Sequence, residues 1–182
     1  MFGLRKDKGR DAGTGVLAGR LATAQACHPR VPEVTAGAAL AASPRPVAIL
    51  PEGATVGDAL RAMADGGASA VAVTSSSSLT GIVSERDHAR AAALGRARDD
   101  APVASVMSRD AAAVAPSDSV RRCLALLAER RVTHAVVLDG GKVVGLLSEV
   151  DLLRAQVAWH ERVFHEIEVD QKLLFLRGTY SC

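Results

Sequence analysis

Gly-Ile-Val-Ser-Glu-Arg-Asp, at residues 81–87, returns as Gly-Leu-Leu-Ser-Glu-Val-Asp at residues 145–151. The glycine, serine, glutamate and aspartate recur at one constant spacing, from positions 81, 84, 85 and 87 to positions 145, 148, 149 and 151, which we call the repeat offset. A fixed offset indicates an internal repeat, and two copies of one supersecondary unit usually bury their apolar faces against each other. We therefore expect a duplicated fold with a cleft at the seam between the copies.

Apolar spacing and turn residues predict the order strand, helix, strand, strand, helix in both copies. In the first copy we expect a strand at 47–50, a helix between the N-cap Thr55 and Gly66–Gly67, strands at 70–74 and 79–83, and a helix at 85–94. In the second copy we expect a strand at 112–114, a helix after Ser119, strands at 135–138 and 142–147 around an Asp-Gly-Gly turn, and a helix from Ser148. The four serines at 75–78 stand in the place of that turn, which predicts a loop tip rather than a phosphorylation or catalytic site.

Composition and charge disfavour nucleic acid as a partner. Aromatic residues make up only 3% of a chain that is 48% apolar, so the core must be aliphatic and stacking platforms for single strands are scarce. Residues 1–45 hold seven Lys/Arg against three Asp/Glu, and residues 46–182 hold fifteen against seventeen. A surface for phosphate backbones would normally make the folded part basic.

Metal, redox and hydrolytic chemistry also have little support in the sequence. The three cysteines are widely spaced, with no Cys-x-x-Cys pair, which favours a reducing cytoplasm over a disulfide framework or a zinc site. His160 and His165 lie five positions apart, about 140° around a helix, too far for a shared metal. No nucleophile elbow, P-loop, targeting signal or membrane-spanning apolar run is present. We predict no catalytic residues, no metal and a cytoplasmic protein that does not insert in membranes.

The two ends of the chain differ in character. Residues 1–45 are rich in Gly, Ala, Pro and Arg without a sustained period, so we expect most of them to be disordered, with a short helix possible at 15–26. The final helix is expected to reach about Leu176, and its apolar residues follow a 4, 3 spacing with two polar positions in the seam: Leu153, Val157, His160, Phe164, Ile167, Gln171 and Leu174. That face needs a partner, either the body of its own subunit or the same helix of a second chain.

The repeated Ser-x-x-Asp spacing has two chemical interpretations. It is the spacing of a capping box, in which the serine accepts the N3 amide and the acid reaches back to the N-cap amide. It also places a helix N-terminus behind a strand, where free amides suit a phosphate and a carboxylate one turn on suits ribose hydroxyls. The glycine three positions before each serine would let a planar group approach the backbone. Both roles are compatible in one motif.

Placed after a strand hairpin in each copy, the glycine, serine and aspartate of 81–87 and 145–151 make residues 44–156 resemble a tandem pair of CBS (cystathionine-β-synthase-type) domains. The ending 175–182 also resembles a tail of small stand-alone bacterial members. The resemblance implies an α/β fold (an α+β sandwich) of two β-α-β-β-α repeats about a pseudo-twofold, which pair as homodimers and bind adenosine-type ligands between repeats. We expect a flexible segment at 1–43, repeats at 44–98 and 99–156, and a C-terminal extension at 157–182.

The resemblance also implies roles for particular residues. Asp87 and Asp151 would bind ribose, Ser84 and Ser148 would bind phosphate, and Gly81 and Gly145 would allow the close approach. Thr133 and His134 match a place where the family contacts base or phosphate, whereas the first copy has only Ala68, Ser69 and Ala70 there. Arg86 puts a cation beside the first phosphate position, where the second copy has Val150. With Arg86 in one copy and Thr133 and His134 in the other, we expect two sites of unequal ligand affinity or a single functional site.

These observations lead to a functional hypothesis and a rival from another class. The leading hypothesis is a non-catalytic regulatory module that needs no cofactor, binds AMP, ADP, ATP, NAD or S-adenosylmethionine as an effector, and signals to an unknown protein through the packing of a homodimer. The rival is a structural or interaction protein whose Ser-x-x-Asp pairs are only helix caps and whose C-terminal helix drives assembly.

Overall fold

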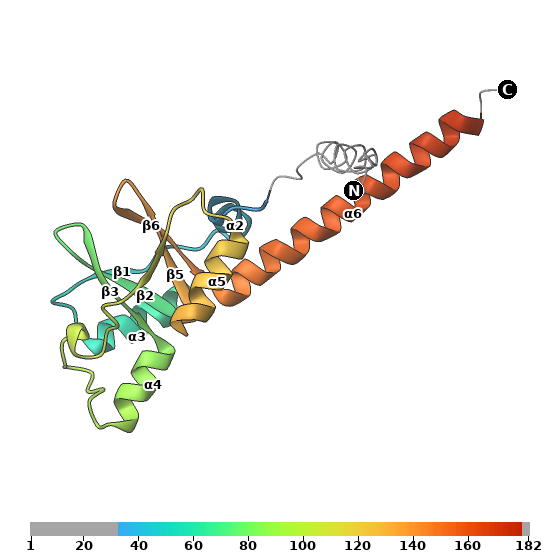
Figure 1. Cartoon of the computed structure of the whole chain (residues 1–182). Coiled ribbons are helices and arrows are strands. Elements are labelled where there is room, and N and C mark those ends of the chain that lie inside the picture. Colours follow the sequence, from blue (N-terminus) through green and yellow to red (C-terminus); the bar gives the residue numbers. More distant parts are fainter. Residues whose placement is uncertain (1–32, 180–182) are drawn as a thin grey trace, which may run out of the picture. The chain divides into compact units, whose positions relative to one another are not determined.

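A computed structural model describes residues 33–179 of the chain. Within this range the two predicted repeats are present, each with a three-stranded sheet (Figure 1). The possible helix at residues 15–26 lies outside the described residues. No helix in the described range is both long enough and apolar enough to span a bilayer.

The first repeat begins with a short strand and ends with a helix. Its elements are β1 (Ile49–Pro51), α3 (Val56–Gly66), β2 (Ala70–Ser75), β3 (Ser78–Ser84) and α4 (Glu85–Ala93). β1 runs parallel to β2, and β2 pairs antiparallel with β3. Ser76 and Ser77 form the hairpin tip with positive φ, so the tetraserine connects two strands as predicted.

The second repeat has the same elements in the same order. A short 3-10 helix (Val103–Ser105) leads to β4 (Ala112–Val114), α5 (Val120–Arg130), β5 (His134–Asp139), β6 (Lys142–Ser148) and α6 (Glu149–Thr179). The pair Ala72 with Ile82 recurs at the repeat offset as Val136 with Leu146, and the bulges that interrupt the two hairpins recur in the same way. The duplication therefore extends to the hydrogen-bond register, and the predicted α/β class is confirmed.

Local chemistry explains where the helices begin and end. Thr55 caps α3 through a complete capping box with Asp58, and Ser119 accepts the amide of Arg122 at the start of α5. Gly67 ends α3 in the left-handed conformation that glycine adopts without steric cost. These boundaries match the prediction from sequence.

Aliphatic residues form the core, as the low aromatic content predicts. One cluster lies under each sheet, around Val71 and Val73 in the first repeat and around Val137 and Leu147 in the second. A third cluster joins the sheets through buried Ala70, Ile82 and Val136. The seam between the repeats is thus packed at its centre, and clefts are left to either side of it.

The segment before the first repeat differs from our expectation of disorder up to residue 43. Helix α2 (Ala36–Ala42) packs into the core of the second repeat, with Ala36 fully buried. The amide of Gly37 donates to the carbonyl of Pro116 at 2.9 Å. Alanine and glycine gave no apolar periodicity in the sequence, yet their small side chains allow the backbone of α2 to lie close to the second repeat.

Helix α6 extends a little past the predicted end near Leu176. Its first turns pack on α2 and α5 and bury Leu152. Farther along, Phe164 and Ile167 are 65% and 47% exposed. Within the described residues, the body of the subunit therefore covers only the beginning of this helix.

Candidate functional site

The first Ser-x-x-Asp motif forms a complete helix cap and keeps one carboxylate oxygen available. Ser84 ends β3, and its hydroxyl and amide donate to Oδ2 of Asp87 at 2.5 and 3.0 Å. The Asp87 amide donates back to the Ser84 hydroxyl at 3.3 Å. Oδ1 of Asp87 accepts no hydrogen bond from any residue between 33 and 179. The capping role is therefore real and leaves an acceptor beside the helix N-terminus.

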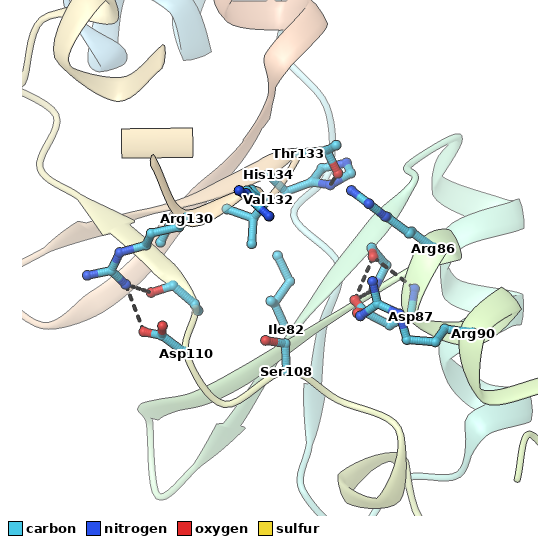
Figure 2. Close-up of a pocket in the computed structure, with 14 residues that line it drawn as sticks. Ile82, Arg86, Asp87, Arg90, Ser108, Asp110, Arg130, Val132, Thr133 and His134 are labelled. Atoms are coloured by element: carbon cyan, nitrogen blue, oxygen red, sulfur yellow. Dashed lines mark hydrogen bonds and ion pairs between the residues drawn. The ribbon is translucent and has the colours of Figure 1, made fainter. Parts of the chain in front are cut away.

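A cavity of about 490 Å³ opens beside this motif, with a lining drawn from both repeats (Figure 2). Ser84, Arg86 and Asp87 come from the first repeat, and Thr133 and His134 come from the second. From the sequence we predicted Arg86 in one site and Thr133 and His134 in the other, and that assignment is wrong, because all three line this cavity. Each cleft lies at the seam, so the motif of one repeat faces the central strand of the other.

His134 is held by a hydrogen bond on each ring nitrogen. Nε2 lies 2.7 Å from the hydroxyl of Ser69, and Nδ1 lies 2.9 Å from the hydroxyl of Thr133. Burial lowers the pKa of His134, although Asp151, Asp87 and Glu85 act in the opposite direction. A neutral imidazole at the edge of the cavity favours contact with an uncharged ring over contact with a phosphate.

The two glycines of the repeated motif serve a different contact from the one we expected. A β-carbon at Gly81 would lie 2.7 Å from the carbonyl oxygen of Ser108, and one at Gly145 would lie 2.5 Å from Cδ2 of Leu40. Neither glycine lines the two cavities at the seam. Their missing side chains admit the chain's own linker and helix α2, so the interpretation that they face a ligand is not supported here.

The second Ser-x-x-Asp motif has the same cap but a different neighbour. Ser148 donates its hydroxyl and amide to Oδ2 of Asp151 at 2.6 and 3.0 Å. The guanidinium of Arg45 forms an ion pair with the other oxygen, Oδ1. The cavity here is only about 130 Å³, and Leu40 and the segment around Arg45 form one of its walls.

The charges at the second cleft offset each other. Burial alone would raise the pKa of Asp151, but the hydrogen bonds from Ser148 and the charge of Arg45 outweigh it and hold that pKa below its usual range. Arg109 is the counterpart of Arg45 at the repeat offset, yet it pairs with Glu52 at 3.5 Å instead of with Asp87. The carboxylate oxygen that is available in the first cleft is therefore occupied in the second.

Several residues of the two clefts were not predicted from the sequence. Those at the first cavity are Arg90, Ser108, Asp110, Arg130 and Arg131, and Arg45 was missed at the second. They lie outside the repeated heptapeptide, and all except Arg90, which lies in α4 with the first motif, come from the opposite repeat or a linker. Comparing positions separated by the repeat offset was the available signal, since it pairs Arg45 with Arg109 and Gly67 with Arg131.

Among the residues that the structure describes, the remaining candidates do not form a second chemical site. Cys123 is fully buried in the core of the second repeat, and burial raises the pKa of its thiol. No group of three or more His, Cys, Asp or Glu side chains in the range 33–179 could hold a metal ion.

Comparisons with known proteins agree with the duplicated architecture. The family model of the CBS domain matches residues 42–91 and again residues 103–158, together more than half of the chain. A CBS domain-containing mitochondrial protein of Arabidopsis thaliana is 29% identical over 132 residues, which are 69% of this chain and 62% of that protein. The chain spans less than two-thirds of the length of the curated relatives it matches.

Solved structures of CBS-domain proteins also match the fold of this chain. A protein with CBS domains from Burkholderia ambifaria is 36% identical with a TM-score of 0.64, over 69% of this chain and 95% of the other. A CBS-domain protein from Pyrobaculum aerophilum, complexed with AMP, is 25% identical with a TM-score of 0.60, over 69% of this chain and 99% of the other.

Proposed function

Because this chain belongs to the CBS-domain family, with two copies of the domain in tandem, we propose that it is a non-catalytic regulatory module for an adenosine-containing ligand. The observation that carries the proposal is the cavity beside Asp87, where the free carboxylate oxygen, a helix N-terminus and groups of the opposite repeat converge. Its volume of about 490 Å³ lies within the ordinary range for small-molecule sites. The AMP complex of a related CBS-domain protein supports the ligand class.

The lining residues predicted from the sequence then have distinct chemical roles. Oδ1 of Asp87 accepts hydrogen bonds from the ribose hydroxyls, while Oδ2 continues to cap α4. The guanidinium of Arg86 at the N-terminus of α4 binds the phosphate, and the Ser84 hydroxyl joins it by turning away from Oδ2 of Asp87, to which it donates in this structure. Thr133 and His134 contact the base across the seam. The second cleft, with Asp151 paired to Arg45, is the weaker site.

A ligand in this cavity would contact both repeats at once. It therefore has a different affinity for arrangements that bring the repeats together and for those that separate them, which is the requirement for shifting an equilibrium between two states. We propose that the protein is a homodimer whose packing responds to that shift, and that α6 transmits the change to the partner subunit or to a regulated protein.

The test is a calorimetric and thermal-shift titration with AMP, ADP, ATP, NAD and S-adenosylmethionine. A ligand at 100 times its Kd should stabilise the fold by about 2.7 kcal/mol. Asp87→Ala should abolish the main binding event, and Asp151→Ala should leave it in place. No response to the whole panel, or unchanged binding in a variant that carries both Asp87→Ala and Asp151→Ala, would refute the proposal.

The complete capping boxes favour a second candidate, a structural or interaction protein in which Asp87 and Asp151 only cap helices. Asp58 provides a matched control, because it closes the same kind of box at Thr55 and does not line either seam cavity. Each loss of a cap should cost about 1 kcal/mol. If Asp87→Ala and Asp58→Ala destabilise the fold equally, and neither variant changes the binding of any compound in the panel, the structural role is the better account.

A further inference from the structure

Arg131 adopts a left-handed backbone conformation, and the equivalent residue of the first repeat is a glycine. Gly67 ends α3 at φ 56° and ψ 30°, and Arg131, its equivalent at the repeat offset, ends α5 at φ 56° and ψ 37°. Left-handed backbone is strained for a residue with a β-carbon and unstrained for glycine. The second repeat thus has an arginine where glycine would fit better, and Arg131 lines the cavity beside Asp87.

The charges around that cavity are strongly unbalanced. Four arginines line it, from α4 on one side and from the end of α5 on the other: Arg86, Arg90, Arg130 and Arg131. Figure 2 shows Arg130 beside Asp110, which it contacts at 2.8 Å, while Arg86 and Arg90 extend from the opposite wall. In the part of the chain that the structure describes, Arg86, Arg90 and Arg131 form no ion pair.

The three guanidinium groups without an ion pair are divided between two walls of the cavity, Arg86 and Arg90 on α4 and Arg131 at the end of α5, so a single phosphate on the Arg86 side leaves Arg131 without an anionic partner. Asp87 is the other carboxylate in the lining, and the proposed function assigns it to ribose. Guanidinium groups bind phosphate oxygens in a bidentate manner, and a phosphate chain carries more negative charge than a single phosphate. A neutral nucleoside would leave the three cations unmatched, and a sulfonium compound would add a further positive charge.

From this arrangement we infer that the cavity selects a nucleotide with a chain of two or three phosphates, and that Arg131 determines this specificity by reaching the outer phosphates. The inference rests on the proposed function and narrows its ligand class. Arg86 beside the helix N-terminus binds the first phosphate, and Arg131 on the opposite wall is available to the rest of the chain.

The test compares adenosine, AMP, ADP and ATP by calorimetry on the full chain and on Arg131→Gly. ATP and ADP should bind the unaltered chain more tightly than AMP does. Arg131→Gly should weaken ATP binding about tenfold or more and leave adenosine and AMP nearly unchanged. Because glycine relieves the strained backbone, the ligand-free Tm of this variant should rise by about 2 °C, so lost affinity is not lost folding.

Two further variants separate charge from strain. Arg131→Ala removes the guanidinium and keeps the β-carbon, so it should lose ATP affinity without the gain in Tm. Arg121→Ala removes a charge from the exposed face of α5, outside the cavity, and should bind like the unaltered chain. ATP binding that is equal for the unaltered chain and both Arg131 variants would overturn the inference.

The outcomes also distinguish this inference from the proposed function. If AMP and adenosine bind but the added phosphates of ADP and ATP bring no gain, the inference fails and the proposed function stands. If no adenosine compound binds while tripolyphosphate binds and responds to Arg131→Gly, the cavity recognises a phosphate chain and the proposed function fails.

Discussion

His134 is a single residue that lines both clefts, and its ring bonds to both repeats. Its pKa is lowered by burial below the ordinary value of 6.5. Below pH 6.5 the unfolded chain therefore binds more protons at this residue than the folded chain does. Stability from the neutral imidazole is fully present above pH 6.5 and is lost as the pH falls from 6.5 toward the lower folded pKa.

We predict that the free energy of unfolding, measured with urea, decreases as the pH is lowered from about 6.5 to about 5.5. His134→Gln keeps a polar group at this position without a titration in that range, so its stability should depend less on pH. The exposed His165 provides the control variant His165→Gln, which should follow the unaltered chain. Equal pH dependence in all three proteins would show that His134 does not carry the effect.

At the scale of elements, α2 and the linker that follows it decide how the two clefts differ. Leu40 packs against Gly145, and Arg45 occupies Oδ1 of Asp151 from a segment that also forms the wall of the small cavity. The first cleft has no such ion pair in the described residues, because Arg109 contacts Glu52. The segment before the first repeat is thus the cause of the asymmetry.

We predict that Arg45→Ala opens the second cleft. The stoichiometry of the adenosine-type ligand should change from one to two per chain, as measured by calorimetry. Stability should fall by about 1–2 kcal/mol in urea denaturation, because Asp151 is buried and loses a charged hydrogen-bond donor. Arg109→Ala removes the repeat counterpart and should leave the stoichiometry at one. A single binding event in both variants would show that Arg45 does not block the cleft.

The elements differ in how far the sequence predicts them. Strands and caps follow from local chemistry, so the limits of β4 and the capping residues Thr55, Ser84 and Ser119 were predictable. Helix α2 was not, because its burial depends on tertiary contact with the second repeat and its alanines show no period. The pairing of the first motif with Thr133 and His134 also depends on how two sheets meet, which a motif within one repeat does not encode.

At the scale of the whole molecule, the part of α6 from Val157 onward has an apolar face that the described subunit leaves largely exposed. Val157, Phe164 and Ile167 are 56%, 65% and 47% exposed, and they follow the 4, 3 spacing of a coiled-coil seam together with His160. An apolar stripe with this spacing packs against a second helix that has the same spacing, and a second copy of the chain provides such a helix. The proposed homodimer would therefore bury this face.

We predict that Ile167→Glu dissociates the dimer, because it places a charge in each of two facing helices within one apolar layer. Sedimentation equilibrium should give the mass of two chains for the unaltered protein and the mass of one chain for the variant. Arg162 lies on the outer side of the helix in this spacing, so Arg162→Ala is the matched control and should remain dimeric. Ligand affinity at the Asp87 cleft should persist in Ile167→Glu if α6 transmits the signal without forming the site. A full chain that is monomeric at micromolar concentration, or a dimer that withstands Ile167→Glu, would mean that this face serves a different partner.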